Sequence, residues 1–310
     1  MKPLRIGTRA SALARWQAQE VARALRERHP GVTTELVELT TAGDDQPDAP
    51  LERLEGIGWF TSTLERALLE NRIDVAVHSY KDLPVAEESA LRIVATLPRG
   101  PVEDVLCARA GARLASLPPG GRVGTSSLRR LAQLRLMRPD LSYVPLRGNV
   151  PTRLDRVARG DLDAVVLARA GLERLGFMDR VSEVFPVASV LPAPGQGALA
   201  IQTRALDREM TELAAALDHA PTHRAVRAER EVLRRLRGGC SVPVGVSVRA
   251  VGAHFLLAAG VFATRGSEAL RVELEGADPI ALGEEAAHQL VRRGALRILE
   301  RNAATEEAPA

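Results

Sequence analysis

The chain is short of cysteine, aromatic residues and lysine, and each shortage narrows what it can be. Its two cysteines, Cys107 and Cys240, are too few for a disulfide framework. Aromatic residues make up 3% of the 310 residues, so aliphatic side chains must build the core and few rings can stack on nucleic-acid bases. A chain of this length with 45% hydrophobic residues has room for two or three compact domains.

Long apolar runs are missing too. The longest, FLLAAGVFA at 255–263, is far shorter than a membrane span, and no apolar segment of signal-peptide length follows the basic residues near the N-terminus. We therefore expect a cytoplasmic protein that makes no use of a membrane.

The basic residues are almost all arginine, since only Lys2 and Lys81 among the 42 basic residues are lysine. Genome composition or adaptation to heat explains most of this bias, while a need for bidentate carboxylate or phosphate binding is the more specific explanation. The 39 acidic residues nearly balance the basic ones, which argues against a nucleic-acid-binding surface.

Strand-like and helix-like segments alternate through most of the chain, which is typical of α/β domains with parallel sheets. Strands are predicted at 3–8, 33–39, 73–79, 91–97, 104–110, 122–127, 141–148 and 162–168. Helices are predicted at 12–28, 60–72, 128–138, 151–160, 208–219, 221–237 and 281–301. Crossings between domains are predicted at 98–101 and 191–204. Successive strands at 242–251, 254–263 and 269–276 predict a small α+β domain with an antiparallel sheet.

Small hydroxyl residues and arginines open a helix after several predicted strands, at 8–11, 125–130 and 147–153. A helix N-terminus offers unpaired N–H groups and the positive end of a dipole, both of which suit an anion. N-capping alone explains any one of these places. Their succession favours a cleft for a ligand with several carboxylates, and phosphates stay an alternative although nothing matches a Walker or dinucleotide motif.

The segment HSYKDLP at 78–84 follows a predicted buried strand. The carboxylate of Asp82, beside Lys81, could stabilise a cation or move a proton there, although a solvated turn residue gives the same pattern. We interpret His78 as a structural histidine. No cluster of His and Cys has the spacing of a metal site, so no metal is expected.

The two cysteines differ in their surroundings. Cys107 lies in an apolar strand and is interpreted as a core residue. Cys240 follows Gly238 and Gly239 on a loop between a helix and a strand, where the backbone can approach another group closely. The arginines that precede this loop favour a thiolate, which is typical of a nucleophile or a point of covalent attachment.

An ordered set of motifs resembles the porphobilinogen deaminase family, also called hydroxymethylbilane synthase. The motifs are IGTRASALA at 6–14, DVAVHSYKDLP at 74–84, VGTSSLRRLAQL at 123–134, LRGNVPTRL at 146–154, GLERLG at 171–176, LPAPGQGALAI at 191–201 and RGGCSVPVG at 237–245. Because the set extends from Ile6 to the cysteine loop, the resemblance covers most of the chain.

The resemblance implies two α/β lobes of the type II periplasmic-binding-protein kind with mixed sheets, plus a small α+β C-terminal domain. The active cleft of the family lies between the two lobes. The domains expected from it are 1–98 with 198–218 (domain 1), 101–195 (domain 2) and 220–302 (domain 3), followed by a flexible tail at 303–310.

The resemblance also implies a transferase of tetrapyrrole biosynthesis. Such an enzyme condenses four porphobilinogen molecules head to tail with loss of ammonia and releases hydroxymethylbilane by hydrolysis. A dipyrromethane cofactor, attached to Cys240 by a thioether, primes the growing polypyrrole. Each pyrrole carries an acetate and a propionate, in agreement with the expected polycarboxylate. The family further implies a monomer whose product passes to uroporphyrinogen III synthase.

Carried over by motif, Asp82 is the catalytic carboxylate, which stabilises the cationic pyrrole and azafulvene intermediates and mediates proton transfer. The expected cofactor-binding residues are Cys240, Lys81, Thr125, Ser127, Arg129, Arg130 and Gly148. The expected substrate-binding residues are Arg9, Ser11, Arg147, Asn149, Arg153, Arg174 and Gln196.

One segment departs from the family, which commonly has a mobile lid loop close to GKGLFTKELE. Here the segment is GIGWFTSTLE at 56–65, with Ile57 and Ser62 where basic residues are usual. Phe60 is kept and could still cover the cofactor, and Arg53 offers a replacement charge. Gln202 stands where an acid is common.

Other functions fit parts of the sequence. A non-enzymatic two-lobed carboxylate-binding protein has the same fold, and a lyase could use Lys81 for a Schiff base. A secreted binding protein needs a signal peptide and a transcription regulator needs a helix-turn-helix segment, and neither is found. None of these alternatives explains RGGCSVPVG at 237–245.

Overall fold

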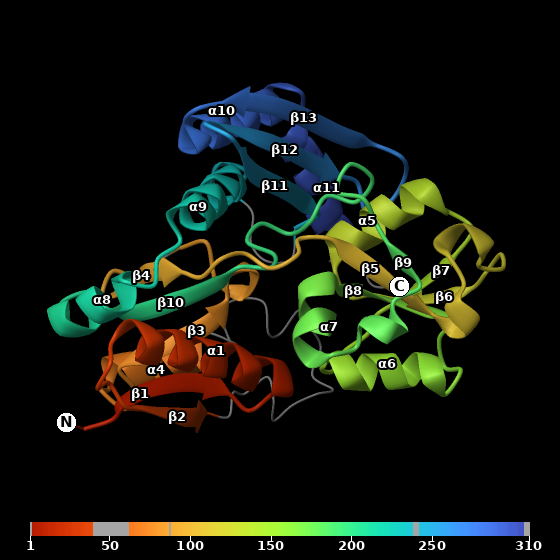
Figure 1. Ribbon diagram of the computed structural model, residues 1–310. Coiled ribbons are helices and arrows are strands. Elements are labelled where there is room, and N and C mark those ends of the chain that lie inside the picture. Colours follow the sequence, from red (N-terminus) through yellow and green to blue (C-terminus); the bar gives the residue numbers. More distant parts are fainter. Residues whose placement is uncertain (1, 40–61, 87, 238–241, 307–310) are drawn as a thin grey trace. The chain divides into compact units, whose positions relative to one another are not determined.

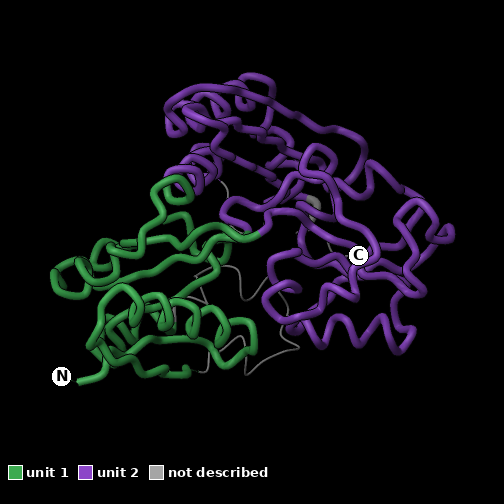
Figure 2. Tube along the Cα trace, in the orientation of Figure 1, with its two compact units in different colours: residues 1–100, 197–223 green, residues 101–196, 224–310 purple. Residues whose placement is uncertain are grey.

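Residues 2–39, 62–86, 88–237 and 242–306 are described by the structure, a computed structural model (Figure 1). The chain divides into two compact units (Figure 2). Unit 1 contains residues 1–100 and 197–223, and unit 2 contains residues 101–196 and 224–310. The chain therefore leaves unit 1 and returns to it within the crossings predicted from the sequence.

Within its described residues, unit 1 is built on a five-stranded sheet in the order β2-β1-β3-β10-β4. The strands are β1 (Leu4–Arg9), β2 (Thr34–Leu39), β3 (Val75–Ser79), β4 (Leu91–Thr96) and β10 (Leu199–Arg204). Strands β1, β2 and β3 are parallel, whereas β10 is antiparallel to both β3 and β4. The predicted mixed sheet is thus confirmed, and its reversed strand comes from the return crossing.

Helices cover both faces of this sheet. They are α1 (Ala12–Arg28), α4 (Ser62–Leu69) and α8 (Arg208–Ala215). Because side chains alternate along a strand, Val75 and Val77 of β3 face one side, where they share a core with Leu25 of α1. Ala76 faces the other side and packs with Leu64 of α4. The apolar composition of 73–79 predicted a strand buried on both faces, and β3 indeed contributes to two separate apolar layers.

Unit 2 contains a second sheet, which has the order β7-β6-β8-β5-β9 in the part that the structure describes. The strands are β5 (Asp104–Ala108), β6 (Arg122–Gly124), β7 (Ser142–Val144), β8 (Ala164–Ala168) and β9 (Glu183–Val184). Strands β6, β7 and β8 are parallel, and β5 runs antiparallel to β8. The helices are α5 (Leu128–Met137), α6 (Val150–Ala158) and α7 (Arg169–Leu175). Leu134 of α5 packs on one face of the sheet, and Val157 and Leu172 of α6 and α7 pack in the other apolar layer.

The C-terminal part of unit 2 has the predicted antiparallel sheet, in the order β11-β12-β13. Its elements are α9 (Ala220–Arg235), β11 (Val244–Val251), β12 (His254–Phe262), β13 (Ala269–Gly276), α10 (Pro279–Arg292) and α11 (Ala295–Glu306). The fully buried carboxylate of Glu229 accepts hydrogen bonds from the N–H groups of Gly195 and Val248, each 2.7 Å long, and so ties α9 to β11. Because these residues share a unit with 101–195, the separate third domain stays a prediction.

The last helix differs from the prediction. A single helix at 281–301 was expected, but Gly294 adopts a left-handed φ of 96° and separates α10 from α11. Helix α11 then continues to Glu306, through residues 303–306 of the predicted tail. Buried Asn302 holds it in place, because its Oδ1 accepts hydrogen bonds from the N–H and Oγ1 of Thr264. Residues 307–310 lie outside the described residues.

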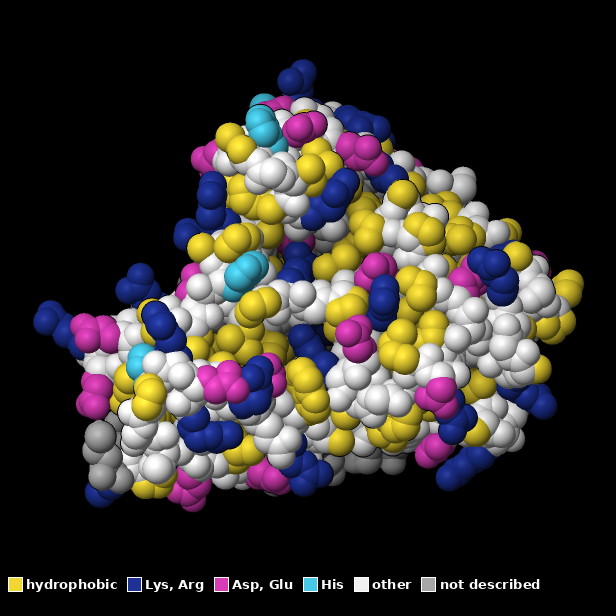
Figure 3. Space-filling view, in the orientation of Figure 1, with side chains coloured by type: hydrophobic (Ala, Val, Ile, Leu, Met, Phe, Trp, Pro, Cys, Tyr) yellow, Lys and Arg dark blue, Asp and Glu magenta, His cyan; other side chains and the backbone are white. Residues whose placement is uncertain are grey.

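The surface carries charges of both signs. On the face shown in Figure 3, Lys and Arg side chains are interspersed with Asp and Glu. Arg23 of α1, for example, pairs with Glu20 and Glu27 on the same exposed helix face. Exposed pairs of this kind contribute little stability. None of the helices described here combines the length and the apolarity that crossing a membrane requires.

At Gly245 of β11, the small antiparallel sheet packs closely against the loop before β10. A Cβ at Gly245 would lie 2.5 Å from Leu191 Cβ and 2.9 Å from the Leu191 carbonyl oxygen. We expect Gly245→Ala to lower the free energy of unfolding by about 1–3 kcal/mol in urea titrations, because the core is overpacked. Gly276→Ala is the control, since its Cβ would meet only the tip of Leu282 at 3.2 Å. Equal stability of the two variants would contradict the prediction.

Candidate functional site

The predicted site residues of unit 1 lie at one edge of its sheet. Strands β1 and β3 are parallel neighbours, paired at Ile6 with Val75, so their carboxyl ends point the same way. Arg9 is the last residue of β1 and Ser11 follows it, and Lys81 and Asp82 follow β3. Ser11 caps α1, where its Oγ accepts a hydrogen bond from the N–H of Ala14 (3.3 Å). Topology thus gathers residues that are about 70 positions apart in the sequence.

Asp82 lies at the end of a short 3₁₀ turn, Tyr80–Asp82, that directly continues β3. The Tyr80 ring is buried. The backbone N–H of Tyr80 donates to the carbonyl of Ala198 (3.0 Å), the residue directly before β10. The N–H of Leu83 donates to the carbonyl of Tyr80 (3.2 Å) and closes the turn. The backbone of the turn is therefore fixed, while the carboxylate of Asp82 is exposed to solvent.

The predicted site residues of unit 2 follow its parallel strands in the same way. Thr125 and Ser127 come after β6, and Ser127 caps α5 by accepting a hydrogen bond from the N–H of Arg130 (3.4 Å). Asn149 comes after β7 and caps α6, accepting from the N–H of Thr152 (3.0 Å). Two helix N-termini with polar caps therefore lie at one edge of this sheet.

The turn before α6 needs a glycine. Gly148 has a φ of 97°, and a Cβ there would lie 2.9 Å from Thr152 Cγ2. Its carbonyl oxygen accepts a hydrogen bond from Nε of Arg153 (2.8 Å), which places this guanidinium beside the turn. Arg147, just before the turn, is partly exposed. Arg174 belongs to the last turn of α7.

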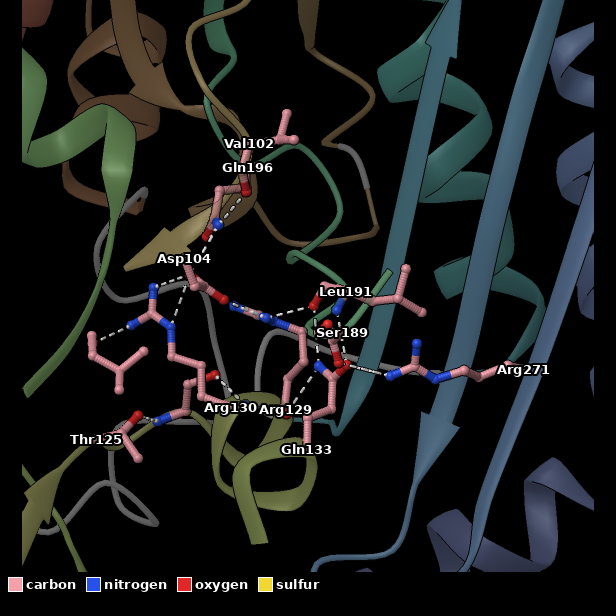
Figure 4. Close-up of polar contacts among 12 residues, drawn as sticks. Val102, Asp104, Thr125, Arg129, Arg130, Gln133, Ser189, Leu191, Gln196 and Arg271 are labelled. Atoms are coloured by element: carbon pink, nitrogen blue, oxygen red, sulfur yellow. Dashed lines mark hydrogen bonds and ion pairs between the residues drawn. The ribbon is translucent and has the colours of Figure 1, made fainter. Parts of the chain in front are cut away.

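Arg129 and Arg130, both at the start of α5, converge on one buried carboxylate, that of Asp104 at the start of β5 (Figure 4). Arg129 Nη1 donates to Asp104 Oδ2 at 2.7 Å. Arg130 donates to Oδ1 through Nε at 3.1 Å and Nη2 at 2.8 Å. The arginines are only 4% and 6% exposed, and Asp104 is fully buried. Two guanidiniums thus share a single carboxylate in the interior of unit 2.

Backbone carbonyls and amide side chains complete this cluster. Arg129 Nη1 also donates to the carbonyl of Leu191 (2.6 Å), and Arg130 Nη1 to that of Val166 (3.0 Å). The side chain of Gln196 donates through Nε2 to Asp104 Oδ1 (3.0 Å) and to the carbonyl of Val102 (2.7 Å). The predicted residues Arg129, Arg130 and Gln196 are therefore held together by one acid.

The cluster carries more positive than negative charge. Burial alone would raise the pKa of Asp104, but the attraction of Arg129 and Arg130 outweighs it and holds that pKa below its usual range. Burial lowers the pKa of Arg129, yet a guanidinium stays charged in proteins. One carboxylate cannot neutralise two guanidiniums, and Arg129 Nε is buried without a hydrogen-bond partner. The arrangement suits a further anion.

Asp104 is the residue that the sequence analysis missed. Its only signal was an acid at the start of the apolar strand 104–110. Recognising its partners requires knowing that β5 is antiparallel to β8 and lies under α5, which the sequence pattern does not reveal. The acid is paired with Ala168 in the sheet, at the carboxyl end of β8.

Several predicted residues lie outside the described residues: Cys240, Phe60, Ile57 and Arg53. Cys107, in contrast, is confirmed as a core residue, since it is 2% exposed in β5. Burial raises the pKa of its thiol to about 12. Among the residues that the structure describes, no group of three or more His, Cys, Asp or Glu could hold a metal ion.

Two sequence-family models match the chain. The model described as porphobilinogen deaminase, dipyromethane cofactor binding domain, matches residues 4–212, and the model described as porphobilinogen deaminase, C-terminal domain, matches residues 223–292. Curated relatives are similar over nearly their whole length. The porphobilinogen deaminase of Thermobifida fusca (strain YX) is 48% identical over 312 residues, and that of Desulforudis audaxviator (strain MP104C) is 49% identical over 298 residues. Each alignment covers 96% of both chains.

Among solved structures, the methionine binding protein MetQ is 14% identical, with a TM-score of 0.45 over 69% of this chain and 89% of that one.

Asp104→Asn tests the buried cluster. Removing the negative charge leaves two buried guanidiniums without a counter-ion, and we expect the free energy of unfolding at pH 7 to fall by about 3–5 kcal/mol. Because the folded pKa of Asp104 is lowered, its contribution is complete above the ordinary pKa and is lost as the pH falls below it. Urea unfolding of both proteins should therefore differ most near neutral pH and converge in acid.

Asp140→Asn is the control for this experiment. Asp140 forms an ion pair with Arg138 in the same unit (2.6 Å), but it lies at the surface. Its removal should change stability little at any pH. A similar, pH-independent effect of the two substitutions would contradict the role given to Asp104.

Proposed function

The chain belongs to the porphobilinogen deaminase family, and on that premise we propose how its own residues carry the reaction. The enzyme is a transferase of tetrapyrrole biosynthesis that condenses porphobilinogen molecules head to tail, with loss of ammonia, and releases hydroxymethylbilane. Residues 4–212 match the part of the family that binds a dipyrromethane cofactor.

We propose that the buried arginine cluster holds carboxylates of this cofactor. The observation that supports it is the charge imbalance around Asp104, together with the unpartnered Nε of Arg129. A dipyrromethane carries an acetate and a propionate on each ring, and guanidiniums bind carboxylates through paired hydrogen bonds. The donors in unit 2 therefore fit the group in charge and in chemistry. Asp104 prevents the two guanidiniums from repelling each other and orients their remaining N–H groups.

Further residues are proposed to hold the same carboxylates and those of the substrate. For the cofactor they are Lys81, Thr125, Ser127 and Gly148, and for the substrate they are Arg9, Ser11, Arg147, Asn149, Arg153, Arg174 and Gln196. Most of them lie beside helix N-termini, where N–H groups and the helix dipole favour negative charge. When bound, the cofactor supplies the pyrrole to which the first substrate is joined.

Cys240 is proposed as the residue that anchors the cofactor through a thioether. The chain has two thiols, and the one in β5 is unsuited to attack, since burial raises the pKa of Cys107 to about 12. Cys240 therefore remains as the thiol available for covalent attachment. We propose that Phe60 covers the site.

Asp82 is proposed as the catalytic acid–base group. Its carboxylate is exposed at the end of a turn whose backbone is fixed by the hydrogen bonds of Tyr80 and Leu83. An ionised carboxylate in that place stabilises positive charge on a pyrrole ring and takes up or returns a proton as the ring reacts. Lys81, next to it, offers a positive charge to substrate carboxylates.

The remaining features are proposed from the family alone. Residues 220–302 form a third domain that carries the anchor. The enzyme is a cytoplasmic monomer, and its product passes to uroporphyrinogen III synthase.

The intact mass of the purified protein tests the anchor. We expect an excess equal to two linked pyrrole units in the wild-type protein, and the bare polypeptide mass in Cys240→Ser, because only the thioether survives denaturation. Cys107→Ser is the control and should keep the excess, since that thiol is buried. A bare wild-type mass that incubation with porphobilinogen never raises would contradict the proposal and favour a non-enzymatic binding protein.

Asp82→Asn tests the catalytic assignment. The variant should fold and carry the cofactor mass, but its kcat for hydroxymethylbilane should fall by at least about 100-fold, because an amide cannot exchange a proton or balance a cation. Glu88→Gln, which removes an exposed carboxylate from the same segment, should keep wild-type kinetics. Near wild-type turnover by Asp82→Asn would remove this assignment.

A further inference from the structure

His78, the second-last residue of β3, is buried and hydrogen-bonded. It does not belong to the site residues proposed above. It is 5% exposed, and its Nε2 lies 3.0 Å from Oε1 of Gln202 on β10. Burial lowers the pKa of His78 to about 4, so the ring is neutral at the pH of an enzyme assay. The interpretation of His78 as a structural histidine agrees with its burial and with the partner of its Nε2.

The amide of Gln202 is itself held in one orientation. Its Nε2 donates to Oε1 of Glu65 on α4 (3.1 Å), so its Oε1 must face His78. His78 Nε2 is consequently the donor, and the ring is the neutral tautomer with hydrogen on Nε2. The chain from His78 through Gln202 to Glu65 connects three elements, β3, β10 and α4, on the α4 face of the sheet.

The next residue, Ser79, is fixed on the opposite face. Its Oγ accepts a hydrogen bond from Nε2 of Gln17 on α1 (2.7 Å), and Gln17 is 3% exposed. The last two residues of β3 are therefore each held by a buried glutamine, one on either face of the sheet. Directly beyond them the chain enters the turn that ends at Asp82.

We propose that His78 is a positioning residue for the reaction, because its hydrogen bond to Gln202 fixes the end of the strand from which Lys81 and Asp82 project. The proposal rests on the catalytic role proposed above for Asp82. The position of the Asp82 carboxylate depends on the end of β3, and a shift of about 1 Å at a reacting group is enough to cost a large factor in rate. A buried series of hydrogen-bonded side chains fixes a geometry more strictly than apolar packing does, because each donor and each acceptor needs a partner in a defined direction.

The test compares His78→Leu with His78→Gln in the holoenzyme. Leucine fills the space but cannot donate, so kcat should fall about 10- to 100-fold while KM stays within about twofold and the cofactor mass is unchanged. Glutamine places an N–H donor near the position of Nε2, so His78→Gln should recover most of the kcat. Such a rescue separates positioning from a simple loss of stability.

His29→Leu is the matched control. His29 also lies in unit 1, is partly buried, and bonds through Nε2 to the carbonyl of Leu213 (2.9 Å), at the opposite end of α1 from Ser11. Its loss should lower the melting temperature but leave kcat unchanged. If His78→Leu behaves in the same way, with a lower melting temperature and wild-type kcat, the positioning role is overturned.

Failure of the two proposals can be told apart. An inactive Asp82→Asn with a fully active His78→Leu would leave the catalytic assignment in place and remove the role of His78 alone. An active Asp82→Asn would remove the role of Asp82 and, with it, the reason for positioning the turn. If His78→Leu does not fold, the kcat of His78→Gln decides, since a loss as large as about 100-fold despite the restored donor would also contradict the proposal.

Discussion

The attraction between one buried carboxylate and two guanidiniums is the interaction on which unit 2 depends. Asp104 is the first residue of β5, and through Arg129, Arg130 and Gln196 it connects the central sheet, the first turn of α5 and the loop that returns to unit 1. Charges are costly to bury, and the desolvation is offset only when each has a good partner. Here the partners are supplied, yet a positive charge is left over. The cluster therefore keeps an excess positive charge, which an anionic ligand would neutralise.

The two units use one construction for different chemistry. In each, parallel strands end at one edge of a mixed sheet, and residues from distant parts of the chain meet there. Unit 1 presents a carboxylate on a rigid turn, at Asp82, whereas unit 2 presents guanidiniums and helix N-termini. A polycarboxylate substrate that passes through cationic states needs both kinds of group. The two units differ in chemistry because different residues follow their strands, whereas the strands themselves are similar.

Much of this architecture could be predicted, because strand periodicity and helix caps are local. Strands β1 to β8 and the caps at Ser11, Ser127 and Asn149 follow from short patterns, whereas β9 was not predicted and β10 was assigned to a crossing. Asp104 could not be predicted, since its partners come from segments that only the reversed direction of β5 brings close. The extension of α11 was missed for a similar reason, because Asn302 is held by Thr264 on another element. Local patterns marked Asp82 and Cys240 as candidates but left alternatives open, and family resemblance supplied the specific roles proposed for them.

The position of β10 has a consequence for the order in which the molecule is made. Strands β3 and β4 both pair with β10 and not with each other, and β10 ends at Arg204. While the ribosome has produced only the first half of the chain, these two strands expose unpaired edges on either side of a missing strand. Such edges are open to mispairing between nascent chains. The sheet of unit 1 can close only after the five-stranded sheet of unit 2 has been synthesised, because β10 follows β9 in the chain.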